Sequence, residues 1–147
     1  MKDEMYFEDF RVGDKFKIPS RTMTDAHFLF FAGMTGDNHP LHYDQEYCKQ
    51  TRFGRPVAHG LMVAGMAAVG ASNLSPAIKD SIVAFLEQSS RFLKPVFVGD
   101  TLSVALEVAG MEPRRTTGVV RMRTSMTNQR GELVMEGSHT YLFKRRG

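Results

Sequence analysis

The residues best suited to chemistry in this chain of 147 residues gather in one hexapeptide, residues 37–42, which reads Asp-Asn-His-Pro-Leu-His. Pro40 has no backbone N–H and pushes the residue before it out of the helical region, so we expect a loop. A tight loop can bring the carboxylate of Asp37 and the imidazole of His42 to one point, as a general acid–base pair near neutral pH. The same spacing is also typical of a helix-capping Asp37 followed by histidines on a loop surface, and both interpretations stay open.

The second candidate is the pair His59-Gly60, which begins an apolar segment. The first residues of a helix present backbone N–H groups that have no acceptor within the helix. A glycine there allows a ligand to approach the backbone closely, which is the geometry of an oxyanion hole. Alternatively, Gly60 simply lets a helix begin in a crowded place.

The elements that must position these residues divide into a helical first half and a strand-rich second half. Apolar spacing predicts helices over residues 24–36 and 44–49, and a buried helix, apolar on all sides, over 59–71. A strand is expected over 15–21, and alternation after Pro76 predicts strands over 81–93, 101–111, 117–128 and 132–144. The length suits one domain, so we predict a single α+β domain over residues 1–147, its antiparallel sheet wrapped around the central buried helix.

Composition excludes several classes of protein. Hydrophobic residues make up 42% of the chain and charged residues 24%, as in ordinary globular proteins. The single cysteine, Cys48, rules out an internal disulfide and a cysteine-cluster zinc site, so we expect a cytoplasmic location. We expect no signal peptide at the acidic N-terminus, and the longest apolar stretch, 57–74, is too weakly hydrophobic to span a membrane.

The net charge of +3 is unevenly distributed, because from Pro113 onward eight Lys and Arg residues face two Glu. A basic C-terminal third suits a polyanionic ligand, either nucleic acid or the phosphates of a nucleotide-based cofactor. A solvated strand face with a basic tail explains the charge equally well. Aromatic residues do not interleave with Arg121 and Arg123 as they do in nucleic-acid stacking platforms, so we expect no nucleic-acid partner.

Three segments together resemble a known family. Residues 37–42, residues 54–60 (Gly-Arg-Pro-Val-Ala-His-Gly) and residues 95–101 (Pro-Val-Phe-Val-Gly-Asp-Thr) resemble the MaoC-like, R-specific enoyl-CoA hydratases. The resemblance implies the hotdog fold, a homodimer at least, and reversible hydration of a trans-enoyl-CoA to an R-3-hydroxyacyl-CoA. The acyl-CoA is then the substrate, and no separate cofactor or metal is implied.

The resemblance also implies roles for single residues. Asp37 would take a proton from water, His42 would hold that water, and the backbone N–H of Gly60 would polarise the thioester carbonyl. Substrate contacts are expected from a further set of residues: Asn38, His39, Pro40, Phe53, His59 and Met62. The chain departs from the family where His39 replaces a common asparagine, and where residues 67–69 (Ala-Ala-Val) lack the serine of some members.

Three rival functions use the same residues. A metal site could combine Asp37 with His39, His42 and His59, although no His-Glu-x-x-His motif is present. A hotdog thioesterase generally carries an acidic residue on or beside its central helix, and residues 60–75 contain none. A non-catalytic acyl-CoA-binding protein would not need Asp37 and His42 together.

Overall fold

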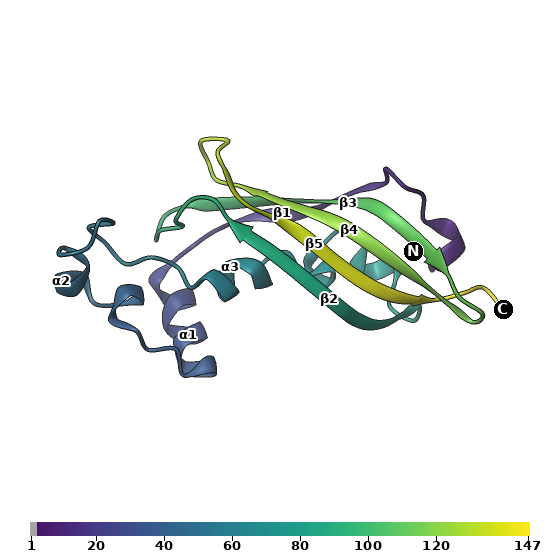
Figure 1. Ribbon diagram of the computed structural model, residues 1–147, viewed down its shortest axis with the longest axis horizontal. Helices are drawn as coiled ribbons and strands as arrows, with labels where there is room; N and C mark the ends of the chain where they lie inside the picture. Colours follow the sequence, from purple (N-terminus) through teal and green to yellow (C-terminus); the bar gives the residue numbers. More distant parts are fainter. Residues whose placement is uncertain (1–2) are drawn as a thin grey trace.

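A single antiparallel sheet of five long strands dominates the computed structural model, which describes residues 3–147 (Figure 1). In chain order the strands are β1 (Lys15–Thr22), β2 (Ile82–Phe92), β3 (Thr101–Pro113), β4 (Thr117–Thr127) and β5 (Leu133–Lys144). Their order across the sheet is β1-β3-β4-β5-β2, so β1 and β2 form the two edges. Each predicted strand is present, with ends displaced by one or two residues.

Alternating side chains give the sheet one apolar face. In β4, Val120, Met122 and Met126 are buried, whereas Arg121 and Arg123 point outward and are exposed. This is the division predicted from the period of two, and β3 repeats it with its own buried aliphatic residues. The apolar face therefore requires a cover, which the helical segments supply.

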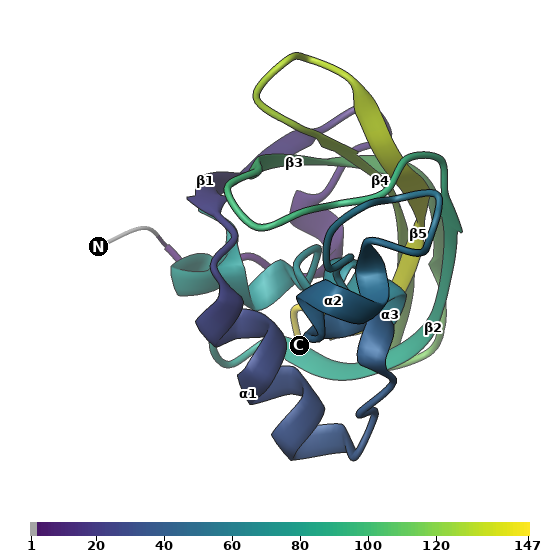
Figure 2. The same cartoon turned by 90° about the vertical axis from the view of Figure 1, so that its left-hand side faces the viewer.

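The helices are short and lie on one side of the sheet. They are α1 (Asp25–Thr35), α2 (Gln45–Cys48) and α3 (Gly60–Gly65), with 3₁₀ turns at Phe7–Asp9, Pro40–His42, Val69–Ala71 and Ser75–Ala77. The sheet curves around α3, while α1 and α2 lie toward one end of the molecule (Figures 1 and 2). Within residues 3–147, no helix is long and apolar enough to cross a membrane.

The central helix differs from the prediction in length and in burial. Residues 59–71 were expected to form one helix buried on all sides, but α3 ends at Gly65 and Leu61 is 69% exposed. The helix tightens into a turn and then stops at Ala68, whose backbone is extended. The next N–H, that of Val69, donates to the Tyr141 hydroxyl (3.1 Å), so a bond to β5 replaces one within the helix. Glycine at 65 and 70 makes continuation of the helix less favourable.

Helix α1 delivers the chain into the hexapeptide of residues 37–42. Its buried side is narrow, because Phe28 and Ala32 are buried while Leu29 is 58% exposed. Gly36 ends the helix in the left-handed conformation (φ 79°), and its N–H donates to the carbonyl of Ala32 (2.8 Å). A glycine adopts this conformation without strain, and the chain therefore turns sharply into Asp37.

Candidate functional site

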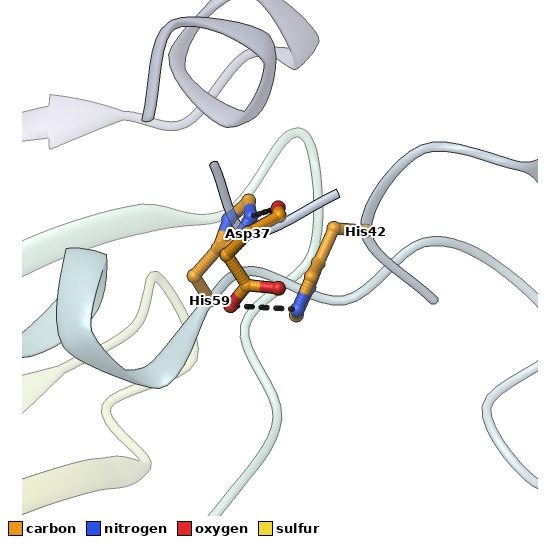
Figure 3. A group of neighbouring side chains, drawn as sticks. All are labelled: Asp37, His42 and His59. Carbon is orange, nitrogen blue, oxygen red and sulfur yellow. Dashed lines mark hydrogen bonds and ion pairs between the residues drawn. The ribbon is translucent and has the colours of Figure 1, made fainter. Parts of the chain in front are cut away.

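The hexapeptide forms the tight loop that its proline predicts, and it brings Asp37 and His42 together. The backbone N–H of Leu41 donates to Nδ1 of His39 (3.1 Å), and Pro40 begins the 3₁₀ turn that ends at His42. Oδ2 of Asp37 consequently lies 3.8 Å from Nε2 of His42 (Figure 3). This gap is longer than a hydrogen bond, so one water molecule could contact both groups.

The orientation of His42 is fixed by the backbone of Val57. Nδ1–H of His42 donates to the carbonyl of Val57 (2.7 Å), and the N–H of Val57 donates to the carbonyl of Leu41 (3.0 Å). Nε2 therefore faces Asp37 and is free to accept or release a proton. The side chain of His42 is 13% exposed and that of Asp37 is 50% exposed, so the carboxylate is the more open of the two. The sequence did not predict this role of Val57, because every residue type has a backbone carbonyl.

His59 lies beneath this pair and contacts both of its residues. Its ring is 1% exposed and stacks on the ring of His42, with centroids 3.7 Å apart and planes 22° apart. Its Nε2–H donates to the backbone carbonyl of Asp37 (3.1 Å; Figure 3). Burial lowers the pKa of His59, so the ring is neutral at pH 7. The His59 side chain therefore supports the Asp37–His42 loop, and its contact with substrate stays a prediction that burial makes less favourable.

Gly60 follows His59 and is the first residue of α3. Its N–H has no acceptor within the helix, and the residue is solvent-exposed. A Cβ added at Gly60 would lie 3.4 Å from the ring of Phe92, so the backbone is close to β2 at this point. This arrangement agrees with the free donor that the sequence suggested.

Two cavities flank the loop that leads to α3. The larger, about 470 Å³, is lined by His42 together with Phe28, Gly54 and Arg55. The smaller, about 240 Å³, is lined by Gly60 together with other residues of the loop and of the 92–96 segment. The two candidate centres of chemistry thus each open on a cavity.

The remaining predicted contacts lie at different depths. Asn38 and His39 are exposed on the hexapeptide, and Pro40 is half-buried there. Phe53 is half-buried in the wall of the smaller cavity, whereas Met62 is 8% exposed and belongs to the hydrophobic core. Substrate contact by these five residues stays a prediction, and Met62 is the least accessible of them.

A cation could also be held at this point. Asp37, His42 and His59 each offer a ligand atom, and these atoms lie within 4.8 Å of one another, whereas His39 is outside the group. However, Nε2 of His59 already donates to the Asp37 carbonyl, and its Nδ1 is buried without a hydrogen-bond partner among the described residues. His59 would have to break that bond to bind a metal through Nε2, whereas Nδ1 could bind one without doing so.

The basic C-terminal third is largely neutralised within the protein. Arg145 pairs with Glu8 (2.7 Å), and Arg146 pairs with Asp9. Arg123 lies 4.0 Å from Glu107 on the outward face of the sheet. The structure therefore favours the solvated strand face and tail over a polyanion site built from these arginines.

The sequence was compared with protein-family models and with known proteins, and both comparisons found similar sequences. The profile of the MaoC like domain matches residues 9–130. The chain is similar to an (R)-specific enoyl-CoA hydratase from Rhodospirillum rubrum, with 31% identity over 144 residues, 97% of this chain and 94% of that protein. It is also similar to a 3-hydroxybutyryl-CoA dehydratase from Methylorubrum extorquens, with 33% identity over 136 residues, 90% and 80% of the two chains.

Solved structures share the fold over nearly the whole chain. One, described as a monoamine oxidase regulatory protein from Archaeoglobus, has a TM-score of 0.93 and 34% identity, and covers 99% of this chain and 98% of that chain. Another, a double hotdog protein from Mycobacterium tuberculosis, has a TM-score of 0.81 and 25% identity, and covers 97% of this chain and 45% of that chain. The sheet wrapped around α3 is thus the hotdog fold, as expected.

Proposed function

This chain belongs to the MaoC-like domain family, and from that premise we propose that it hydrates trans-enoyl-CoA thioesters to R-3-hydroxyacyl-CoA and catalyses the reverse dehydration. The observation that carries the proposal is the meeting of Asp37 and His42 at 3.8 Å, with His59, the residue before Gly60, stacked on the ring of His42. The relatives named as a hydratase and a dehydratase support the two directions of one reaction.

The chemistry requires a water, a proton and an oxyanion donor. Asp37 and His42 hold a water, and one of them takes its proton as the oxygen bonds to the β-carbon of the enoyl group. A proton is returned to the α-carbon, so the net change is the addition of one water with no change in redox state. Between these steps negative charge develops on the thioester oxygen, and the N–H of Gly60 stabilises it. We propose no further cofactor, because the reaction adds the oxygen and protons of one water and transfers no electrons to or from another molecule.

The proposal is tested with crotonyl-CoA, the product of 3-hydroxybutyryl-CoA dehydration, by following the loss of its enone absorbance. We expect the native protein to hydrate it and Asp37→Asn, which keeps the size of the side chain, to lose at least about 100-fold in kcat. Equal turnover by Asp37→Asn and native protein would remove Asp37 from the mechanism. A folded native protein that binds acyl-CoA without turnover would favour the non-catalytic binding protein.

We further propose that the chain works as a homodimer that pairs through the β2 edge. A strand edge with exposed apolar side chains is usually covered by another chain. β2 and the residue after it expose five such side chains: Val83, Phe85, Leu86, Phe92 and Leu93. Since Phe92 also lies against Gly60, the pairing edge would adjoin the site.

A further inference from the structure

The loop between α2 and α3 carries two arginines that no carboxylate neutralises. Within residues 3–147, neither Arg52 nor Arg55 forms an ion pair. Both are exposed. By contrast, Lys49 before the loop pairs with Glu46 at 2.6 Å. The loop thus presents two positive charges that are available to an anion.

The guanidinium group of each of these arginines lies over a phenylalanine ring. The guanidinium carbon of Arg52 lies 4.6 Å from the ring centroid of Phe53, and that of Arg55 lies 3.9 Å from the ring centroid of Phe97. The two rings meet edge to face, with centroids 6.5 Å apart. Stacking orders a guanidinium and leaves its N–H edge free, and that edge fits the oxygens of a phosphate.

The same loop is tied to the candidate catalytic residues. The N–H of Val57 donates to Leu41 of the hexapeptide, and the carbonyl of Val57 accepts from His42. Arg55 lines the larger cavity with His42, and Arg52 lines the smaller cavity with Gly60. A ligand whose anionic group is bound by these arginines could therefore place its reactive part at Asp37, His42 and Gly60.

We propose that Arg52 and Arg55 bind the phosphate groups of coenzyme A in the acyl-CoA substrate, an inference that rests on the hydratase activity proposed above. A simple enoyl thioester is uncharged, so the anionic groups of such a substrate are its phosphates. The five peptide steps from Arg55 to Gly60 span at most about 18 Å, a separation that the extended pantetheine arm is suited to bridge.

Charge elsewhere agrees with this assignment. The C-terminal Arg145 and Arg146, which the sequence offered for a polyanion, are already paired with Glu8 and Asp9. Asp25, at the first turn of α1, is an acidic residue in the wall of the larger cavity, and it forms no ion pair with either arginine among the described residues.

The test compares two substrates with the same reactive end: crotonyl-CoA and crotonyl-pantetheine, which lacks the phosphates together with the adenosine that they join. We expect Arg52→Gln and Arg55→Gln each to raise the KM for crotonyl-CoA about tenfold, the lower range for a hydrogen bond to a charged group, because both arginines are exposed. We expect kcat to change less than about twofold and the kinetics with crotonyl-pantetheine to be unaltered. Added salt should raise the KM for the CoA ester alone.

Arg115→Gln is the matched control, because Arg115 is an exposed arginine in the turn between β3 and β4, at the end of the molecule opposite α2 (Figure 1). It should behave as the native protein with both substrates. The proposal is overturned if Arg52→Gln and Arg55→Gln leave both KM values unchanged, or if they impair the two esters equally, since a purely structural role would do the latter.

Calorimetric binding of free coenzyme A separates this proposal from the proposed function. If the native protein hydrates neither ester, the hydratase activity is refuted, while the binding measurement still decides the role of the arginines. Weaker binding to the double variant R52Q/R55Q, with binding to Arg115→Gln unchanged, supports the phosphate site. Equal binding to all three proteins refutes it.

Discussion

Variants of His59 can distinguish two roles for this residue: positioning Asp37 and His42, or contacting the substrate. The perturbation is His59→Phe, which keeps an aromatic ring of similar shape stacked on His42 but removes the hydrogen bond from Nε2 to the Asp37 carbonyl. His59→Gln is the partner variant, because its side-chain amide restores a donor near the position of Nε2 while giving up the stacking.

The expected cost in stability follows from the two nitrogens of the ring. Loss of the bond to Asp37 destabilises the protein by roughly 1 kcal/mol. Nδ1 is buried without a hydrogen-bond partner among the described residues, so its removal stabilises the folded protein by a similar free energy. The free energy of unfolding of His59→Phe should therefore lie within about 1 kcal/mol of the native value. His59→Ala should lose about 3–5 kcal/mol, because it leaves a cavity of aromatic size.

The kinetic effect should be much larger than the effect on stability. Without its bond to His59, the backbone at Asp37 can shift, and small misplacements of a catalytic group cost up to about 100-fold in rate. We expect His59→Phe to lower kcat by about 10- to 100-fold with KM for crotonyl-CoA nearly unchanged, and His59→Gln to recover part of the loss. An increase in KM with kcat intact would refute this reasoning and restore the substrate contact first predicted.

The same residue makes stability depend on pH. Burial lowers the pKa of His59 in the folded protein, so below the unfolded pKa of about 6.5 the unfolded chain binds more protons. The stability contributed by the neutral ring is present above that pH and is lost as the pH falls toward the folded pKa. Urea unfolding between pH 7.5 and about 5 should show a shallower loss for His59→Phe than for the native protein, and identical slopes would contradict the assignment.

Two further outcomes test the remaining proposals. Gly60→Pro removes the N–H at a helix position that tolerates proline, after a His59 whose backbone (ψ 132°) already suits it, and should lower kcat by about 100- to 1,000-fold. Gly60→Ala retains the N–H and should stay far more active in the same assay. Light scattering should give the mass of two chains for the native protein and a shift toward one chain for Leu86→Lys, which places a charge on the exposed β2 edge. An unchanged mass would exclude that edge.

Local sequence predicted the features that depend on neighbouring residues. The period of two placed β4 and its buried Val120 and Met122, since side chains alternate across any strand. Gly36 predicted the end of α1, and Pro40 predicted the loop in which Asp37 and His42 could meet. Each of these features depends on preferences set within a few neighbouring residues, so each could be predicted from the sequence alone.

Tertiary structure decided what depends on distant partners. The central segment stops being helical where the Tyr141 hydroxyl, 72 residues along the chain, accepts the N–H of Val69. His42 is aimed by a carbonyl 15 residues away, and His59 bonds to a carbonyl 22 residues away. A histidine's residue type is the same whether it faces a ligand or lies beneath another ring. Only the tertiary packing, including that of α1 against His59, determines which of the two histidines is buried and which is left to react.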